Sequence, residues 1–224
     1  MNVIWLKSVD STNTWVKNRL AEETLTADGV VAAELQTAGR GRGNNTWESD
    51  KPLGLWASLY RLKTTLPLFH EVAALSVAIV NALREKGAEA VIKWPNDVLV
   101  GRKKICGILA EQSDGALIAG FGVNLLHHDR DFPENLDGLA TSLFLCTGQA
   151  ESPALFLERV IRQYRQPESG TLADYRKHLG IIGEAMAVDG IPVVVENVAE
   201  SGALLCRLDS GETRTFHSGT LRWR

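Results

Sequence analysis

Short apolar runs dominate the chain up to about residue 125 and predict β-strands. The last four of these runs follow one another closely, with turn residues at Gly101–Lys103 and at Ser113–Gly115. Such a succession favours antiparallel strands with helices gathered elsewhere, which is an α+β arrangement. The predicted strands are residues 30–36, 55–60, 91–94, 97–100, 105–111 and 116–123.

Helical patterns lie before, between and after these strands. The segment Glu71–Arg84 is apolar on almost every side, which predicts a helix buried in the centre of a domain. A second helix is predicted from the capping oxygens of residues 10–13 to about Glu23. Two more helices are predicted at residues 153–164 and 172–179.

The pattern changes after Gly183, where short strands alternate with Gly- and Ser-containing turns about 8–12 residues apart. We therefore expect two domains, residues 1–180 and residues 181–224, with a small β-barrel as the second. A unit of roughly 40 residues is marginal by itself, so we expect it to pack against the larger domain. Its predicted strands are residues 185–188, 192–198, 203–208 and 213–217.

The composition is that of a globular protein, with 45% hydrophobic and 23% charged residues among 224. Because 24 basic residues face 27 acidic ones, a main task of coating nucleic acid is disfavoured. The three cysteines are scattered, which indicates reduced thiols and a cytoplasmic location. We see no signal peptide, and the longest apolar run, Val72–Leu83, is too short for a membrane-spanning helix.

A loop rich in glycine and arginine, Gly39–Gly43, is the first stretch with candidate chemistry. Glycine lets backbone N–H groups approach an anion, and Arg40 and Arg42 add permanently charged donors. The stretch suits a ligand that carries phosphate or carboxylate. The alternatives are a flexible solvated loop or a nucleic-acid contact.

The stretch Lys93–Asp97 ends one predicted strand and begins the next. The proline within it interrupts the strand ladder and turns Lys93, Asn96 and Asp97 toward a common concave face. A cation, an amide and a carboxylate so close together suit a phosphate with a magnesium ion. The alternative is an Asn-Asp turn with an incidental lysine.

Two later strands carry glycines where a side chain would be expected. Lys104 and Cys106 share one face of a strand in this pattern, with Gly107 on the other face, where it marks the close approach of a ligand or another backbone. Lys104 is then either a solubilising edge residue or the partner of an anion. Gly120 and Gly122 point to one side and leave a bare floor for a flat ligand, unless they mark a bend in the sheet.

The run His127-His128-Asp129 suggests a metal, but adjacent histidines on an extended segment point to opposite sides. We therefore expect a solvated loop there.

The order and spacing of these motifs resemble the signature series of biotin protein ligases. The likeness is dense from Ser8 to Asn124 and resumes with the C-terminal strands. The residues that carry it are Ser11, Thr12, Asn13, Gln36, Gly39, Arg40, Gly41, Arg42, Lys93, Trp94, Pro95, Asn96, Asp97, Lys104, Gly107, Ile108, Leu109, Glu111, Gly120, Gly122, Val123 and Asn124.

The resemblance implies a catalytic domain related to class II aminoacyl-tRNA synthetases, with a mixed, mainly antiparallel sheet, followed by an SH3-like β-barrel. Because the Ser-Thr-Asn triplet begins at residue 11, it implies the short form of the family, without a winged helix and without DNA binding. Relatives of this kind dimerise by extending the central sheet, so a homodimer is one possible state of this protein.

The reaction implied by the resemblance attaches biotin to the carrier protein of acetyl-CoA carboxylase, with ATP and Mg²⁺. Biotin's carboxylate attacks the α-phosphorus of ATP to give biotinyl-5′-AMP, and a carrier lysine then attacks the acyl-adenylate. Two anions must meet, so the site needs fixed cations. The catalytic residues implied are Lys104, Arg42, Asp97 and Lys93.

The resemblance also assigns residues to each substrate. Biotin's ureido ring needs hydroxyl and amide partners, and Trp47 is a candidate to cover the vitamin. The biotin-binding residues implied are Ser11, Thr12, Asn13, Gln36, Arg40, Gly41, Arg42, Lys104, Gly107, Gly120 and Gly122. The ATP-binding residues implied are Gly39, Arg40, Arg42, Lys93, Asn96, Asp97, Lys104 and Asn124. Asp97 is in addition the candidate magnesium ligand, and our hypothesis for the base that takes the carrier lysine's proton.

Two other functions remain as alternatives. A lipoate–protein ligase of the same superfamily is disfavoured by the joint presence of the Gly-Arg-Gly-Arg and Lys-Trp-Pro-Asn-Asp motifs. A non-catalytic biotin-sensing protein is disfavoured because Lys104 and Arg42 are both retained.

Overall fold

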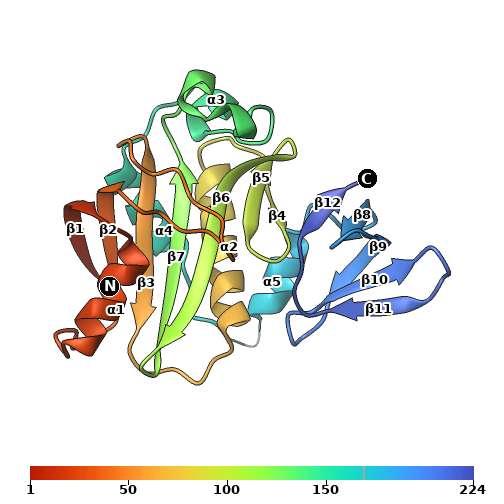
Figure 1. Cartoon of the computed structure of the whole chain (residues 1–224), viewed down its shortest axis with the longest axis horizontal. Helices are drawn as coiled ribbons and strands as arrows, with labels where there is room; N and C mark the ends of the chain where they lie inside the picture. The colour runs from red at the N-terminus through yellow and green to blue at the C-terminus, as the bar shows by residue number, and fades with distance from the viewer. Residues whose placement is uncertain (169) are drawn as a thin grey trace.

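A computed structural model describes residues 1–168 and 170–224, which form two sheets placed side by side (Figure 1). The first has seven strands in the order β1-β2-β3-β7-β6-β5-β4. Its strands are β1 (Asn2–Val9), β2 (Gly29–Gln36), β3 (Gly54–Arg61), β4 (Ala90–Lys93), β5 (Asp97–Val100), β6 (Lys103–Ser113) and β7 (Ala116–Asn124).

The pairing confirms the expected α+β class with a mixed, mainly antiparallel sheet. Only β1 and β2 run parallel in the described sheets, and the other neighbours in the first sheet are antiparallel. Strand β1 was not predicted from the sequence. Its apolar residues are only half-buried because it is an edge strand, so the alternation of the pattern is weak.

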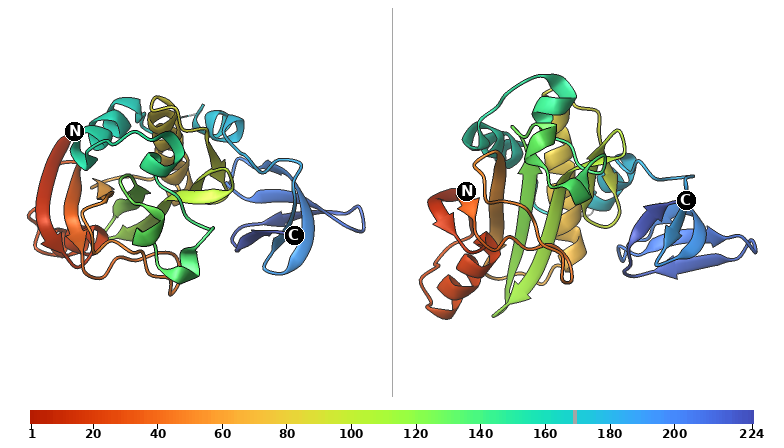
Figure 2. Two further views of the ribbon diagram at one scale, coloured as in Figure 1. Left: turned by 90° about the horizontal axis from the view of Figure 1, so that it is seen from above. Right: turned by 45° about the horizontal axis from the view of Figure 1, so that its top comes forward.

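Helices cover both faces of the first sheet (Figures 1 and 2). The long buried helix α2 packs on one face against β4 and β6, with α4 and α5 beside it, while the short helix α1 lies on the other face against β2, β3 and β7. The predicted helices are all present, and the brief α3 and the two 3₁₀ turns were missed. The helical elements are α1 (Thr12–Ala21), α2 (Leu68–Arg84), α3 (Leu143–Thr147), α4 (Pro153–Gln163), α5 (Thr171–Lys177), η1 (Asp129–Asp131) and η2 (Glu134–Leu136).

A β-bulge in the pairing of β5 with β6 corrects one expectation. Val98 pairs with Cys106 and Leu99 pairs with Lys104, so Ile105 is the extra residue. Ile105 and Cys106 are therefore both buried in the core, and a Cβ on Gly107 would lie 3.0 Å from Lys104 Cε. Strict alternation had put Lys104 with Cys106 and opposite Gly107, which is wrong because the bulge shifts the alternation by one residue.

The second sheet has the strand order β11-β10-β9-β8-β12 and is open between β11 and β12 in the described pairings. Four of its strands were predicted, and the three-residue β12 was missed. The division of the chain at residues 180 and 181 stays a prediction. Its strands are β8 (Ala185–Val188), β9 (Ile191–Val198), β10 (Leu204–Leu208), β11 (Thr213–Phe216) and β12 (Leu221–Trp223).

The two sheets share one hydrophobic core, and polar contacts join them. The indole nitrogen of buried Trp94 donates to Gly202 O at 2.9 Å, and Arg176 Nε donates to Val198 O at 2.7 Å. The free edge of β4 is covered by the linker, since Ile92 N donates to His178 O at 2.7 Å. As the size of the second unit suggested, it packs against the first (Figure 2). No helix among the described residues is long and apolar enough to span a membrane.

Candidate active site

One cavity of about 730 Å³ lies on the α1 face of the first sheet and reaches the second sheet. Its walls are the start of α1, the loop after β2, the β4–β5 turn, strands β6 and β7, and residues 218–221. The predicted site residues that line it are Ser11, Thr12, Asn13, Gln36, Arg40, Gly41, Arg42, Lys93, Asn96, Asp97, Lys104, Gly107, Gly120, Gly122 and Asn124.

Gly39 is the one predicted site residue outside the lining. A Cβ there would collide with the Ser49 side chain and with the carbonyl of Trp47. Gly39 therefore lets the two arms of the loop approach each other, and Trp47 N donates to Gly39 O at 3.0 Å.

The end of the cavity at α1 is a connected set of neutral polar groups. Gln36 Oε1 accepts from Thr12 N at 2.9 Å, and Gln36 Nε2 donates to Ser49 Oγ at 3.1 Å. The fully buried Ser58 hydroxyl donates to Asn13 Oδ1 at 2.6 Å. Ser58 and Ser49 do not line the cavity but hold Asn13 and Gln36 from behind, and they were not predicted because single serines in or after a strand carry no signal of their own.

Ser11 and Asn13 differ in what they can offer a ligand. The Ser11 hydroxyl lines the cavity, forms no capping bond although it stands at the N-cap of α1, and bonds to no other described side chain. Asn13 is fully engaged, because its Nδ2 donates to Leu109 O at 3.2 Å and to Glu111 Oε2 at 2.7 Å. Ser11 is thus free to bind a polar ligand, whereas Asn13 fixes the start of α1.

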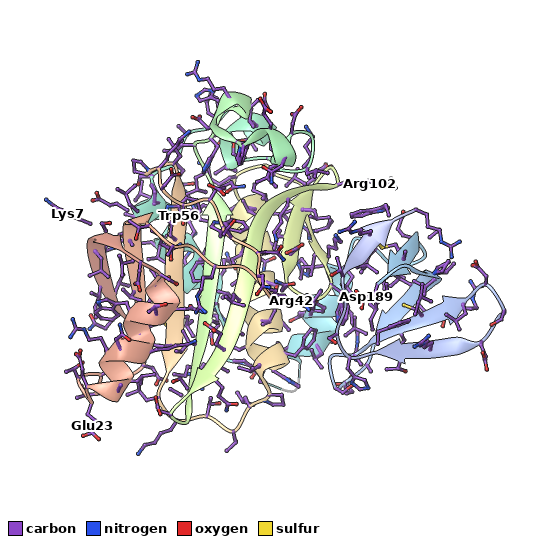
Figure 3. The ribbon with its side chains drawn as sticks, viewed as in Figure 1. Lys7, Glu23, Arg42, Trp56, Arg102 and Asp189 are labelled. Carbon is purple, nitrogen blue, oxygen red and sulfur yellow. The ribbon has the colours of Figure 1, made fainter. Side chains whose placement is uncertain are left out.

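Cations gather at the opposite end of the cavity. Lys104 Nζ lies 2.6 Å from Asp97 Oδ1, and Arg42 Nη1 lies 3.3 Å from Asn96 Oδ1. Arg42 also points to Gly219 O of the second sheet at 3.5 Å, at the side of the first sheet that faces the second (Figure 3). Lys93 is the fifth polar side chain of this wall and lies beside the ring of Trp223.

The charge at this end is positive. Among the described carboxylates none is within 4.0 Å of Arg42 or Lys93, while Lys104 is paired with Asp97 and Arg40 with Glu111. Burial lowers the pKa of Lys93, and its neighbours Lys104 and Arg222 lower it further against the opposing effect of Asp97. Adding an anion here would relieve that repulsion, so this wall suits phosphate or carboxylate groups.

The glycine floor is covered in this structure, which corrects the expectation of a bare surface. A Cβ on Gly122 would collide with the indole of Trp47, and one on Gly120 with the amide of Asn13. Trp47 also stands edge-on to Trp56 at a ring distance of 6.3 Å and under Lys104 Nζ at 5.3 Å. Its buried Nε1 has no hydrogen-bond partner among the described residues, so a ligand acceptor would be favoured there.

Replacing Gly122 with alanine is expected to weaken ligand binding in this cavity about 5- to 150-fold, because a forced shift of packed atoms costs about 1–3 kcal/mol. The change also moves Trp47, so its fluorescence should shift. Isothermal titration calorimetry with the ligand measures the affinity, and emission spectra measure the change in Trp47 fluorescence. Gly170→Ala, where a Cβ meets open space, is the matched control. Unchanged affinity in Gly122→Ala would show that the indole does not lie on the floor.

His127 also lines the cavity. It is buried, so the expectation of a solvated loop at this position is wrong. It is 5% exposed, stacks on Phe132 at 5.1 Å and stands edge-on to Trp56 at 6.0 Å. Burial lowers its pKa from 6.5 to about 4, with Lys51 adding to the effect and Asp131 opposing it. No local pattern predicts this burial, because it arises from packing against Trp56 of β3 and Phe132 after the η1 turn.

The depressed pKa of His127 predicts acid sensitivity. Above pH 6.5 both the folded and the unfolded chain carry neutral His127, whereas between pH 6.5 and 4 only the unfolded chain takes up the proton. Stability contributed by neutral His127 is therefore lost as the pH falls, by about 1.4 kcal/mol per pH unit. Compared with His127→Phe, the native chain should lose about 2 kcal/mol more of its free energy of unfolding between pH 7 and pH 5. Urea titrations at each pH measure this difference, and parallel pH profiles of the two chains would contradict it.

No group of three or more His, Cys, Asp or Glu side chains suited to a metal ion occurs among the described residues. Asp97 and Asn124 are the candidate oxygen ligands of the cavity. Asn124 Nδ2 donates to Thr141 O at 3.0 Å, which orients the amide within the cavity wall. Such a sparse set fits an ion that keeps most of its ligands from phosphates and water, as Mg²⁺ does.

Comparisons with known proteins agree with this geometry. The sequence profile of the Biotin/lipoate A/B protein ligase family matches residues 5–126. The Bifunctional ligase/repressor BirA of Bacillus subtilis is 34% identical over 153 residues, which cover 64% of this chain and 47% of that protein. The Biotin--[acetyl-CoA-carboxylase] ligase of Mycobacterium tuberculosis is 33% identical over 185 residues, 72% of this chain and 65% of that protein.

A solved structure is similar over the whole chain. The biotin protein ligase from Aquifex aeolicus in complex with biotin and ATP has a TM-score of 0.86 and 28% identity, with coverage of 100% of this chain and 99% of that one. The matched part of this chain spans about half the length of the first curated relatives. Because the family profile covers more than half of the chain, the protein belongs to the biotin/lipoate A/B protein ligase family.

Proposed function

We propose that this protein is an ATP-dependent ligase that activates biotin as biotinyl-5′-AMP and transfers it to a lysine of the carrier domain of acetyl-CoA carboxylase. The observation that carries the proposal is a single cavity with a neutral polar end and a cationic end. The Aquifex aeolicus relative, whose structure holds biotin and ATP, supports the choice of substrates. The Mycobacterium tuberculosis relative, named for acetyl-CoA carboxylase, supports the choice of carrier.

The neutral end suits biotin's ureido ring, which offers two N–H donors and one carbonyl acceptor. The Ser11 hydroxyl is free to donate or accept, and Gln36 Nε2 keeps one N–H beyond its bond to Ser49. Polar partners in a pocket that is otherwise packed favour a ligand that pairs with them, because an unpaired buried group is costly. Asn13 contributes by holding α1 in place.

The first reaction step belongs to the cationic end. An oxygen of biotin's carboxylate bonds to the α-phosphorus of ATP, the bond from that phosphorus to the bridging oxygen breaks, and pyrophosphate leaves. Lys104 and Arg42 lie where the two anions would meet, and their fixed charges offset the repulsion. Lys93 and the loop amides near Arg40 are placed for the departing phosphates.

Magnesium belongs to this proposal as an ion that arrives with the nucleotide. Asp97 and Asn124 would hold it, and it would supply positive charge to the phosphates when bound. Lys104 already pairs with Asp97, so the carboxylate and the ammonium are fixed relative to each other before ATP enters.

The second step forms an amide between the carrier lysine and biotin. The amine attacks the acyl carbon, AMP leaves, and the amine loses a proton. Asp97 is our hypothesis for the group that takes this proton. Full transfer by Asp97→Asn from preformed biotinyl-5′-AMP would exclude that role, and a loss confined to adenylate formation would assign Asp97 to the first step.

The cavity would shield the acyl-adenylate, which water hydrolyses. The loop with Arg40 and Arg42 lies over it, and residues 218–221 of the second sheet form the far wall. Excluding water from a reactive intermediate is a common task of such loops. A cytoplasmic location, where ATP and the carrier occur together, is part of the proposal.

Incubating the purified protein with labelled biotin, MgATP and apo carrier domain tests the function directly. We expect biotin-dependent exchange of pyrophosphate into ATP and a label on the carrier that a carrier lacking its acceptor lysine does not take up. Labelling with lipoate in place of biotin would make the protein a lipoate–protein ligase. Exchange or binding without transfer would make it a sensing form.

A further inference from the structure

Glu111, on β6, joins three segments that surround the cavity. Its Oε1 accepts from Lys17 Nζ at 2.7 Å, and its Oε2 accepts from Asn13 Nδ2 at 2.7 Å and from Arg40 Nη2 at 2.8 Å. Asn13 and Lys17 belong to α1, and Arg40 to the glycine loop. One half-buried carboxylate thus binds the start of α1 and the loop that covers the cavity.

On the side of α1, the Glu111 carboxylate fixes the side-chain amide of Asn13. Asn13 and Lys17 are four residues apart and lie on one face of the helix, so both reach Glu111. The opposite end of the Asn13 amide accepts from Ser58 at 2.6 Å. Glu111, Ser58 and the Leu109 carbonyl together set the orientation of Asn13, and with it the position of Ser11 and Thr12 at the neutral end of the cavity.

On the side of the loop, the Arg40–Glu111 bond is the short, charge-assisted contact. Arg42, two residues further, reaches its partners Asn96 and Gly219 only at 3.3 and 3.5 Å. A bond between opposite charges at 2.8 Å is stronger than the longer bonds from Arg42 to a neutral amide and a neutral carbonyl. Trp47 anchors the far arm of the loop on the glycine floor, and Glu111 is the side chain that holds the arginine arm at Arg40.

The charge state of Glu111 supports this arrangement. Burial raises its pKa, but the bonds from Lys17 and Asn13 and the charges of Arg40 and Lys17 outweigh burial and bring the pKa below its usual value. Glu111 is therefore an anion at neutral pH and can hold both cations.

We propose that Glu111 is a positioning residue that couples the neutral end of the cavity to the loop carrying Arg40 and Arg42. It touches neither reacting atom, and it acts through Asn13 and Arg40. As far as substrates are concerned, the inference rests on the proposed function. In this proposal the Glu111 carboxylate holds both the arginine arm of the loop and the side chains at the neutral end of the cavity.

Glu111→Gln tests the proposal, with Lys17→Met as matched control, because Lys17 binds the same carboxylate while the bonds of that carboxylate to Asn13 and Arg40 do not involve Lys17. We expect the KM for biotin in pyrophosphate exchange to rise about tenfold in Glu111→Gln, with kcat changed less than threefold, from the loss of a charged hydrogen bond. Lys17→Met should keep both constants within about twofold. A merely structural role would instead lower the fraction of folded enzyme and leave its KM unchanged.

A readout without substrates separates this inference from the proposed function. Trypsin cleavage after Arg42 should accelerate about tenfold in Glu111→Gln and stay unchanged in Lys17→Met, since opening of the loop follows the bond that is lost. In an Arg40→Met background, adding Glu111→Gln should change the cleavage rate less than twofold, because the two side chains act as one unit.

The outcomes are distinct. A native chain without biotin-dependent exchange, but with the expected cleavage rates, would overturn the function and keep the coupling of α1 to the loop. An active native chain whose Glu111→Gln variant shows native KM and native cleavage would overturn the role of Glu111. Equal effects of Lys17→Met and Glu111→Gln would reduce Glu111 to a residue that only stabilises α1.

Discussion

Replacing Lys104 with methionine is expected to lower the rate of biotin-dependent pyrophosphate exchange about a thousandfold, since removal of one preorganised donor costs about 10²–10³ and this donor also carries the local charge. Methionine keeps the unbranched apolar stem of the side chain up to Cε and lacks only the ammonium, so the loss reports mainly on that charge. The bulge at Ile105 places that ammonium on the cavity side of β6. Initial rates at saturating biotin and MgATP measure the effect.

Lys103→Met is the matched control, because Lys103 is the exposed neighbour outside the cavity lining, and it should retain native rates. Loss of Lys104 also leaves Asp97 unpaired next to incoming anions. The double variant Lys104→Met/Asp97→Asn separates the two causes. Recovery of most of the rate in the double variant would contradict a direct role of Lys104 and point to repulsion by the orphaned carboxylate.

Replacing Trp94 with alanine is expected to lower the free energy of unfolding by about 4 kcal/mol, within the range of 3–5 kcal/mol for large aromatic deletions in a core. Trp94 is among the largest fully buried side chains, and its Nε1 bond to Gly202 joins the two sheets. The deletion leaves a cavity at the junction and an unpaired carbonyl. Urea unfolding followed by circular dichroism measures the loss.

Trp94→Phe divides this effect into its parts. It keeps most of the apolar volume and loses the hydrogen bond, so about 1–2 kcal/mol should be lost. A loss below about 1 kcal/mol in Trp94→Ala would mean that the second sheet does not depend on this contact. Either result bears on function, because residues 218–221 of that sheet form one wall of the cavity.

Much of the fold follows from local patterns. The meander from β4 to β7 was predicted because its turns carry proline or glycine and its strands are short and apolar, and α2 because it is apolar on nearly all sides. Strand β1 was missed because an edge strand buries only part of its apolar residues. Strand β12 was missed because three residues are too few to form a pattern.

The sequence predicted which residues belong to the candidate site, but not how their side chains contact one another. Motifs far apart in sequence meet in one cavity, as their resemblance to a known series implied. Three features depend on contacts between distant segments and leave no local trace. They are the bulge that turns Lys104 to the cavity, the indole of Trp47 on the glycine floor, and the carboxylate of Glu111 between Asn13 and Arg40.

The central claim is that the cations of this cavity let biotin's carboxylate attack the α-phosphorus of ATP. Biotin labelled with ¹⁸O in both carboxylate oxygens tests it most directly in a full transfer reaction with the carrier domain. Mass spectrometry of the products should find one ¹⁸O in AMP and none in pyrophosphate, because the bridging oxygen of the anhydride leaves with AMP. Label in inorganic phosphate together with ADP, or AMP without label, would contradict the account.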